Sequence, residues 1–233
     1  MPTPRPEPGL SPSPASYLRS PVGLGRAAAA LLGLVIAVDL FAVYADLALY
    51  DVTGDLMDGA GGRAVTGRLD DAESLNSLAG GVQSGALIAC MIVYLTWFVR
   101  VRANAGLFDP SEQTMKPWWA IGGWFVPFVN IVYPRRITVE IWKSSSPAGT
   151  HRSHWPVNAW WTLWLLSLLG DRLGYTDYGN TDAPDQIHSA AYQLMISDAI
   201  DIAAAGLAIL VVLRLTRMQH EKALAGPVAP VAV

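Results

Sequence analysis

Four aspartates lie inside long apolar stretches, where a charged side chain is rare. Asp39 and Asp46 belong to the first stretch, Asp198 and Asp201 to the last, and Gln83 lies in another. A charge in hydrocarbon costs at least ~2.5 kcal/mol on insertion scales, so each carboxylate is a candidate for function. Carboxylates that cluster in such a medium can keep a proton at neutral pH or bind a cation. These five residues therefore define a candidate proton or cation site.

The spacing of these residues indicates how they would cluster. Asp39 and Asp46 are seven residues apart and Asp198 and Asp201 are three apart, so each pair lies on one face of a helix. If the first helix runs outward and the last runs inward, Asp39 and Asp201 lie near the middle of the bilayer. Asp46, Asp198 and Gln83 then share an outer layer. No basic residue is expected at the depth of the middle pair.

A structural role for the aspartates is the alternative, and we favour it. Neutral or hydrogen-bonded carboxylates can hold helices together inside a membrane. Asp46 and Asp171 could also lie at the outer interface with Arg172 as their partner.

Few other residues could do chemistry. Asn130 follows Pro127 by three residues, so it could bind a polar ligand or, as we favour, satisfy backbone groups that the proline leaves without partners. His151 and His154 have the spacing of metal ligands but no evident third ligand, and Arg152 between them would repel a cation. The sequence contains no nucleophile elbow, P-loop, zincin or dinucleotide-binding motif. We therefore predict no catalytic residue, metal or cofactor.

The composition indicates a membrane protein. Of the 233 residues, 52% are apolar and only 15% are charged, and the apolar residues form long blocks instead of alternating with polar ones. The net charge of −3 argues against a general nucleic-acid-binding protein. Cys90 is the only cysteine in the sequence, so an intrachain disulfide is excluded.

Five apolar stretches are candidates to cross the membrane. A helix needs ~20 residues to cross ~30 Å of hydrocarbon, and the first, second and fifth stretches have that length. The third contains Pro127, which breaks a helix, and the fourth crosses only if residues 171–175 extend it. In chain order the stretches are Ala27–Tyr50, Ala79–Val101, Trp118–Tyr133, Trp155–Gly170 and Ala190–Leu213.

A cleaved signal peptide is the competing interpretation of the first stretch. The residues Val43, Tyr44 and Ala45 loosely resemble a cleavage site, but residues 1–25 are long for the charged segment that precedes one. Residues 1–25 are also rich in proline, serine and glycine, a composition that favours disorder. We therefore predict a disordered tail followed by a retained membrane anchor.

The distribution of lysine and arginine predicts four crossings, because cytoplasmic loops are enriched in these residues. Of the sixteen, only Arg63, Arg68 and Arg172 occur in segments 51–77 and 171–189, against ten acidic residues. Both segments are therefore predicted to be loops on the outer side. The third apolar stretch has basic residues on both flanks, so it is predicted to be a re-entrant or interfacial hairpin on the cytoplasmic side.

We therefore expect an all-α fold, a polytopic transmembrane bundle of four spanning helices with both termini in the cytoplasm. The bundle would occupy residues 26–217 in the cell (plasma) membrane, between the disordered tail and a flexible cytoplasmic tail at 218–233. The hairpin would occupy residues 118–134, and residues 137–143 would form a short helix at the membrane surface. The predicted spans are residues 27–50, 79–101, 155–175 and 190–213.

Aromatic residues agree with this topology. All nine tryptophans occur between Trp97 and Trp164, in the part assigned to the cytoplasmic half, where indoles are predicted to lie at the lipid headgroups. The tyrosines predicted at the opposite interface are Tyr50, Tyr175, Tyr178 and Tyr192.

One part of the chain resembles a known family. The segment W-W-A-I-G-G-W-F-V-P-F-V-N-I-V-Y-P-R-R is followed by I-W-K-S and then by N-A-W-W-T-L-W. This pattern, between about Trp97 and Trp164, resembles a bacterial membrane family catalogued as domain of unknown function 4328. The resemblance implies a membrane protein without supplying a function, and it extends neither to the proline-rich tail nor to the first acidic loop. The matching residues are Trp124, Phe125, Pro127, Asn130, Pro134, Trp142, Trp160 and Trp161.

Small residues share one face of the second predicted helix. Gly81, Gly85 and Ala89 recur every four residues, which allows another helix to approach closely. Such a face most often packs within its own chain. A homo-oligomer could also use it.

Three classes of function remain open. A membrane scaffold or interaction protein requires only the bundle, its cytoplasmic tails and the tryptophan-rich inner surface, and it is the class that we favour. A small proton- or cation-coupled permease requires aspartates that water can reach. A membrane enzyme comes third, because these residues do not assemble into a catalytic constellation. Apart from the lipid bilayer, the sequence identifies no partner.

Overall fold

The structure is a computed structural model that describes residues 18–147, 153–178 and 183–226, with the backbone alone described for residues 171–178. All regular secondary structure in these residues is helical, which confirms the predicted all-α class. Most of the predicted disordered tail lies outside the described residues. The side chains of Asp171, Arg172, Tyr175 and Tyr178 lie outside them as well.

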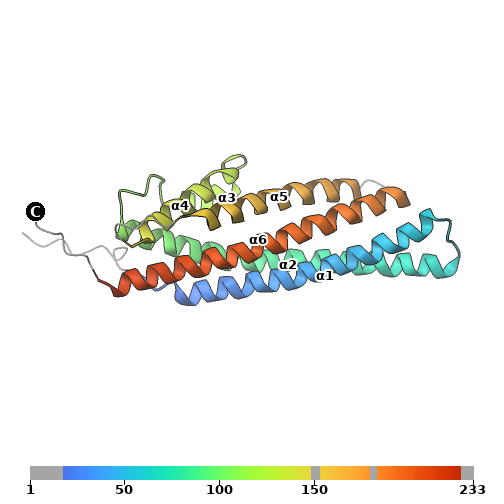
Figure 1. Ribbon diagram of the computed structural model, residues 1–233, viewed down its shortest axis with the longest axis horizontal. Coiled ribbons are helices and arrows are strands. Elements are labelled where there is room, and N and C mark those ends of the chain that lie inside the picture. Colours follow the sequence, from blue (N-terminus) through green and yellow to red (C-terminus); the bar gives the residue numbers. More distant parts are fainter. Residues whose placement is uncertain (1–17, 148–152, 179–182, 227–233) are drawn as a thin grey trace, which may run out of the picture.

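Four long helices and a group of short ones make up the molecule (Figure 1). The long helices are α1 (Val22–Met57), α2 (Arg63–Phe108), α5 (Trp155–Tyr178) and α6 (Pro184–Leu224). The short helices are α3 (Trp119–Phe125), the 3-10 helix η2 (Val129–Ile131) and α4 (Tyr133–Ser145). The long helices lie side by side along the long axis of the molecule, and α3 and α4 lie toward one end.

Contacts between side chains give the helix directions. Gln83 and Trp97 of α2 bond to Asp198 and Thr216 of α6, respectively, so α2 and α6 run parallel. α1 packs against both of them and, because only residues 58–62 join it to α2, runs in the opposite direction. α5 packs against α6.

The two ends of the molecule differ in charge. One end, which we call the basic end, contains Arg102, Arg135, Arg136, Arg214 and Arg217. Here α3, η2 and α4 pack against the other helices. The opposite end, which we call the acidic end, contains the connection between α1 and α2.

The segment predicted to be the first outer loop, 51–77, is mostly helical, so that prediction was wrong. α1 and α2 leave only residues 58–62 outside helices. Gly59 and Gly62 adopt φ values of 87° and 95°, left-handed conformations that glycine reaches without steric cost because it has no Cβ. A tight connection is therefore sufficient, and both helices continue past the ~20 residues that a membrane requires.

α6 also extends beyond its predicted boundary. The flexible tail was predicted from residue 218, but the helix continues to Leu224. Gln219 is buried and donates to the hydroxyl of Ser145 in α4, and Lys222 donates to two carbonyls at the end of α4. Tertiary contacts therefore hold this polar part of α6 in place, which hydropathy does not reveal.

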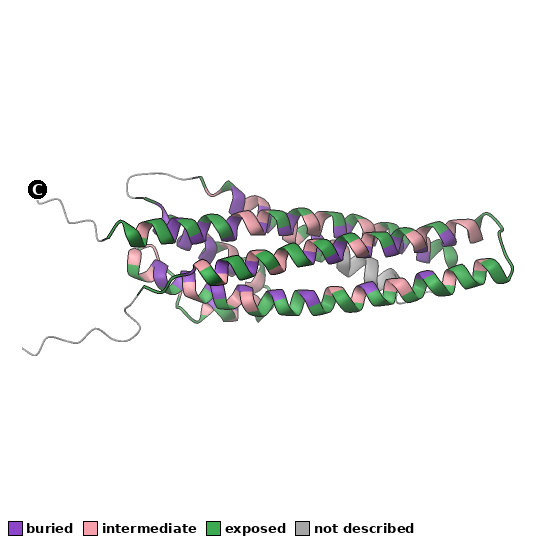
Figure 2. Ribbon diagram, turned by 90° about the horizontal axis from the view of Figure 1, so that it is seen from below, coloured by how far each residue is buried: buried purple, intermediate pink, exposed green. Residues whose placement is uncertain are grey.

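Most tryptophans form a core at the basic end, and their depth relative to the lipid headgroups stays a prediction. Seven of the nine pack in one hydrophobic cluster, and only Trp118 and Trp155 are more than half exposed, at 55% and 56%. Buried residues follow the helix faces that point toward one another (Figure 2). Aromatic rings that pack together gain ~0.5–1.5 kcal/mol per pair beyond the area that they bury. The clustered residues are Trp97, Trp119, Trp124, Trp142, Trp160, Trp161 and Trp164.

The short helix predicted at the membrane surface exists, but its position differs. α4 contains the predicted residues 137–143. Ile137, Ile141 and Trp142 are buried in the tryptophan cluster, so this helix is part of the protein core. The prediction of a surface helix was therefore wrong in its location.

Three helices, α1, α2 and α6, are long and apolar enough to cross a membrane. Large apolar side chains are exposed on all three, among them Leu40, Ile92 and Ile196. Such faces suit contact with lipid. The chain is therefore compatible with insertion into a membrane through these three helices.

The small-residue face of α2 points away from the other helices. Gly81, Gly85 and Ala89 are exposed, and a Cβ atom at either glycine would meet nothing within 4 Å. This face does not pack within the described part of the chain. A homo-oligomer through it stays a prediction.

Gly25, predicted to lie in the disordered tail, is buried in α1 against α6. A Cβ at this position would lie 2.3 Å from Thr216 Oγ1, the atom that accepts a hydrogen bond from Trp97. We expect Gly25→Ala to lower the free energy of unfolding by up to about 2 kcal/mol, because overpacking costs ~1–3 kcal/mol and the higher helix propensity of alanine offsets ~1 kcal/mol. Thermal unfolding in detergent measures the change.

Gly33→Ala is the matched control, because a Cβ there meets nothing within 4 Å. It should leave the unfolding midpoint unchanged or raise it. Equal midpoints for the two variants would contradict the close approach of α1 to α6.

Candidate functional site

Gln83 joins two of the predicted site residues from neighbouring helices. Its Nε2 atom donates to Oδ1 of Asp39 in α1 (3.2 Å) and to Oδ1 of Asp198 in α6 (3.1 Å). Asp39 is 2% and Asp198 is 9% exposed, so both carboxylates lie inside the protein. A glutamine amide has two N–H bonds, which allows one for each carboxylate. The structure thus brings these three residues together, and an ion site made by them stays a prediction.

Asp46 forms a second link between α1 and α2. Its Oδ1 atom accepts a hydrogen bond from Asn76 Nδ2 (2.5 Å), and the residue is 3% exposed. The structure gives Asp46 a partner in α2, and its position at the outer interface stays a prediction. Asp39 and Asp46 are separated by the same seven residues as Asn76 and Gln83. Because α1 and α2 run antiparallel, the two pairs lie two helical turns apart on facing sides.

Asp201 forms a third link, between α5 and α6. The hydroxyl of Ser167 in α5 donates to Asp201 Oδ1 (3.1 Å). Ser197 of α6 in turn donates to the backbone carbonyl of Ser167 (3.0 Å). Both serines are buried, so these polar contacts lie between packed helices.

The predicted layering of the aspartates was only partly right. Gln83 and Asp198 do lie together, and Asp39, which was predicted in the middle layer with Asp201, shares this contact. Asp46 bonds elsewhere. Asp198 lies about one turn from Asp201, and the long side chain of glutamine reaches across that offset. Counting residues from the ends of the predicted helices does not place a side chain to within one helical turn.

Asn76 and Ser167 were not identified from the sequence. Asn76 lay in the segment predicted to be a loop, although its spacing of seven from Gln83 repeats that of the two aspartates in α1. A search for polar residues at matching spacings would have found it. Ser167 carried no such signal, because isolated serines are common in membrane helices.

The chain reverses direction at residues 126–128, inside the predicted hairpin. α3 ends at Phe125, and Pro127 cannot extend a helix because it lacks an N–H and its ring clashes with the preceding turn. Phe128 then adopts a φ of 64°, which is uncommon for a residue with a side chain. Its side chain is 83% exposed.

Trp161 of α5 contacts the hairpin both before and after Pro127. Trp124 packs edge-on against Trp161 of α5, with ring centroids 6.0 Å apart. The Nε1 atom of Trp161 donates to the backbone carbonyl of Ile131 (3.0 Å). Trp161 therefore performs the task predicted for Asn130, that of bonding to backbone near the break. The role of the Asn130 side chain stays a prediction.

Pro134 lies in the first turn of α4, where its missing N–H has no intrahelical partner to lose. Its carbonyl accepts a hydrogen bond from the hydroxyl of Thr138 (2.7 Å). The neighbouring Arg135 donates to Asn158 Oδ1 of α5 (2.8 Å). The bond from Arg135 to Asn158 fixes the start of α4 against α5.

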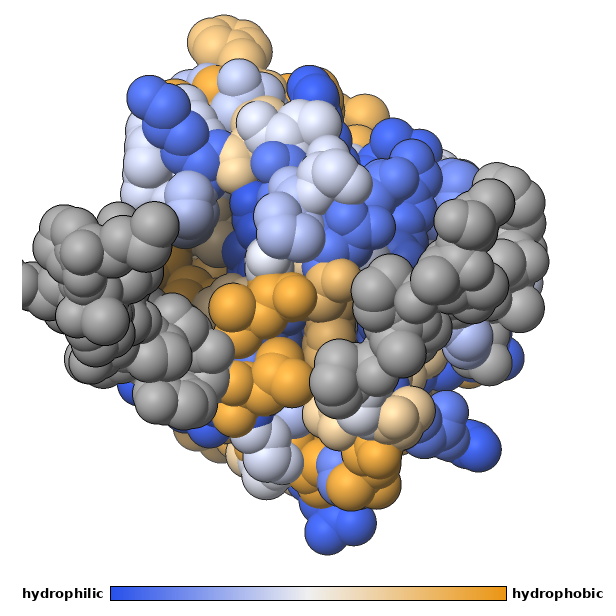
Figure 3. Space-filling model, turned by 90° about the vertical axis from the view of Figure 1, so that its left-hand side faces the viewer, coloured by the Kyte–Doolittle hydropathy of each residue, from blue (hydrophilic) through white to orange (hydrophobic). Residues whose placement is uncertain are grey.

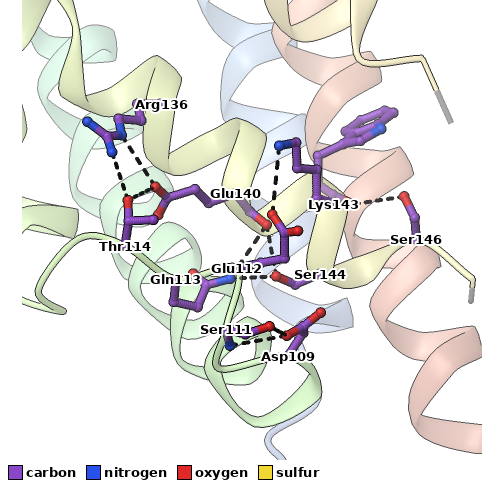
Figure 4. A network of polar contacts seen from close by, with 11 residues as sticks. Asp109, Ser111, Glu112, Gln113, Thr114, Arg136, Glu140, Lys143, Ser144 and Ser146 are labelled. Atoms are coloured by element: carbon purple, nitrogen blue, oxygen red, sulfur yellow. Dashed lines mark hydrogen bonds and ion pairs between the residues drawn. The ribbon is translucent and has the colours of Figure 1, made fainter. Parts of the chain in front are cut away.

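A polar network surrounds Glu140 at the basic end (Figure 4). Glu140 is 6% exposed, accepts a hydrogen bond from Thr114 and has its Oε1 atom 3.4 Å from Nε of Arg136. Gln113 Nε2 donates to Ser144 Oγ (2.5 Å). The network ties the segment between α2 and α3 to α4. The sequence did not predict it, because its members are distant in the chain and form no motif.

Arg102 is buried beside this network. Its guanidinium donates to the backbone carbonyl of Met115 (2.6 Å). Burial lowers the pKa of Arg102, and the negative charge of Glu140 opposes that lowering. The Nε atom of Arg102 and the Oε2 atom of Glu140 have no hydrogen-bond partner in the described part of the chain. Two opposite charges thus lie buried at the basic end.

The tyrosines predicted at the outer interface lie at the acidic end as far as they are described. Tyr50 stacks on His188, with ring centroids 3.7 Å apart, and Tyr192 is exposed. His188 Nδ1 lies 3.2 Å from the Thr53 hydroxyl. Among the described residues no three histidines, cysteines or acids gather as a metal site would require. His151 lies outside those residues.

Residues 63–217 match the model of a family described as domain of unknown function 4328. The chain belongs to this family. The match extends from α2 into α6, includes the hairpin, and begins within the acidic segment that the sequence resemblance left out. α1, with Asp39 and Asp46, falls outside it. No curated protein and no solved structure matches the chain.

We expect Gln83→Leu to lower the free energy of unfolding by about 1–3 kcal/mol, because it removes the amide donor that Asp39 and Asp198 share. Ser84→Ala is the control, since Ser84 is exposed and its hydroxyl bonds only within its own helix, to the Gly80 carbonyl. The control should change stability by less than about 0.5 kcal/mol. Denaturant titration in detergent measures both, and equal stability of the two variants would argue against the bridge.

Proposed function

We propose that the chain is a four-pass membrane protein that acts as a scaffold, holding other membrane components in place. One observation carries this proposal. The carboxylates in the apolar helices are engaged by side chains of neighbouring helices, and such bonds fix helices relative to one another. The bonded pairs are Asp39 and Asp198 with Gln83, Asp46 with Asn76, and Asp201 with Ser167.

The burial of the carboxylates supports a structural role over ion transport. A coupling ion must reach its carboxylate from water on each side of the membrane in turn. Asp39 and Asp46 are buried, and an ion that bound them would compete with the amides of Gln83 and Asn76. Interhelical hydrogen bonds in membranes stabilise by ~0.6–2 kcal/mol each. Several of them across four helices favour one arrangement, whereas a carrier needs two.

Helix direction supports a fourth crossing. α2 and α6 run parallel, so the chain between them must return from the basic end to the acidic end. α5 is the one long helix described in that part, and its 24 residues span ~36 Å, enough for the hydrocarbon core. The N-terminal end of α1 and the C-terminal end of α6 then lie on the basic side. The positive-inside rule assigns this side to the cytoplasm.

The exposed tip of the hairpin supports the proposal that residues 118–134 enter the membrane without crossing it. Its apolar side chains point away from the protein, while Lys116 and Arg135 flank it on the basic side. Backbone that is not helical and lies inside the membrane needs hydrogen-bond partners from the protein. The indole of Trp161 supplies one of them. We infer that this tip is the surface on which other membrane proteins dock. Its exposed residues are Phe125, Val126, Phe128, Ile131 and Val132.

A crossing by α5 predicts that its two ends differ in accessibility. In a Cys90→Ser background, Asp185→Cys should react with a membrane-impermeant maleimide in intact cells. Ser153→Cys should react only after permeabilisation, because it lies at the basic end. Ala60→Cys, in the connection between α1 and α2, is the control for the outer side. Equal reactivity of Ser153→Cys and Asp185→Cys would contradict the fourth crossing.

A scaffold and a permease predict opposite results in reconstituted vesicles. With an imposed proton or sodium gradient, the parent protein should produce no flux above that of protein-free vesicles, measured with a pH- or sodium-sensitive dye. Asp39→Asn combined with Asp201→Asn is the comparison. Flux in the parent that the double substitution abolishes would contradict the scaffold and favour the permease.

The scaffold also requires contact with other proteins. A photoreactive phenylalanine analogue in place of Phe128 should give discrete protein adducts in native membranes. The same analogue in place of Leu40, which is exposed on α1, should give only lipid adducts. Lipid adducts alone at both positions would contradict the hairpin as the docking surface.

A further inference from the structure

A cavity of about 460 Å³ lies at the basic end, between α4, the start of α5 and the last turns of α6. Seen from this end, the molecule carries hydrophilic and apolar patches next to one another (Figure 3). Lys222 of α6 donates to the Ser144 carbonyl at the end of α4, so one side of the cavity is held in place (2.7 Å). The side chains used below are Trp142, Ser153, Trp155, Arg214, Arg217 and Glu221, all of which line it.

The lining of this cavity offers many hydrogen-bond donors and few acceptors. Arg214 forms no ion pair with any described residue. Arg217 uses its Nε to bond to Glu221 (2.7 Å), and a guanidinium has further N–H groups. Trp142 is buried, and its Nε1–H has no hydrogen-bond partner among the described residues. Donors of this kind suit a ligand that carries a negative charge and several acceptor oxygens.

The position of the cavity suits an interface between membrane and water. Arg214 directly follows Leu213, an exposed apolar residue near the end of the apolar part of α6. Trp155, which also lines the cavity, is exposed at the start of α5. Exposed tryptophan beside arginine is typical of the level at which headgroups lie. The cavity therefore opens where a lipid could place its phosphate inside and its acyl chains outside.

We propose that this cavity binds the phosphate of a phospholipid headgroup from the inner leaflet. Arg214 and Arg217 bind the phosphate oxygens, since a guanidinium matches phosphate with two parallel hydrogen bonds. Basic pockets between membrane helices on the cytoplasmic side bind headgroups in this way. The inference rests on the four-pass topology proposed above, which places the basic end at the inner surface.

The charge of the lining indicates which headgroup fits. Two arginines and one glutamate, Glu221, leave one positive charge in excess. A lipid with a single negative charge, such as phosphatidylglycerol, balances that excess. A headgroup with several phosphates would place uncompensated negative charge beside Glu221.

Lipid titration of the purified full-length protein in detergent, followed by native mass spectrometry, tests the proposal. The parent should bind dioleoylphosphatidylglycerol in preference to dioleoylphosphatidylcholine. Arg214→Gln should weaken phosphatidylglycerol binding about tenfold, the usual effect of losing one charge-assisted hydrogen bond. Arg68→Gln is the matched control, because Arg68 lies at the acidic end in an exposed pair with Asp55. It should bind the lipid as the parent does.

Equal affinity of Arg214→Gln and the parent would overturn the proposal. Circular dichroism and gel filtration establish that each variant is folded. If Arg214→Gln does not fold, Arg217→Gln takes its place, since Arg217 is exposed and lines the same cavity, and unchanged lipid affinity in that variant would overturn the proposal equally.

A soluble competitor separates the two sources of phosphate. Glycerophosphoglycerol carries the same singly charged phosphodiester without acyl chains, so it should displace the lipid only at far higher concentration. Displacement at the concentration of the lipid itself would overturn the lipid assignment in favour of a soluble phosphate compound. A failure of the topology would appear separately, in the labelling of Ser153→Cys and Asp185→Cys, so the two failures are distinguishable.

Discussion

Polar groups that are buried away from water must find their partners inside the protein, and the contacts between the long helices follow this constraint. Gln83 satisfies buried carboxylates on two helices at once, because its amide donates to Asp39 of α1 and to Asp198 of α6. Asn76 and Asp46 repeat the contact two turns away, and Ser167 with Asp201 extends it to α5. Each partner lies on a different helix, so satisfying the carboxylates also sets the positions of the helices.

The basic end is stabilised by other interactions. Aromatic rings bury large areas against one another, and seven tryptophans gather there. The same rings support the hairpin, since Trp161 bonds to the Ile131 carbonyl, which follows Pro127 in the chain. Glu140 and Arg102 are buried near them and join the connecting segment to α4. This end therefore combines a rigid core with a hairpin whose tip stays exposed.

Both features of the basic end bear on function. In the scaffold that we propose, the exposed hairpin tip would contact other membrane proteins, and a headgroup bound beside Arg214 would hold this end at the level of the inner membrane surface. A scaffold needs both a fixed depth and an accessible surface. The family match covers the hairpin and most of α6, whereas α1 lies outside it and yet packs between α2 and α6.

The sequence by itself determined the helical class, the apolar segments, the family and the aspartates that needed explanation, because hydropathy, spacing and local motifs are properties of neighbouring residues. Only the tertiary structure decided which side chain meets each carboxylate, since partners such as Asp46 and Asn76 lie 30 residues apart. It also decided that segment 51–77 and the end of α6 are helical, because distant contacts such as that of Gln219 hold polar helix in place. The tryptophans show the same limit: an indole suits both a headgroup layer and a core, and only the packing of distant helices selects between them.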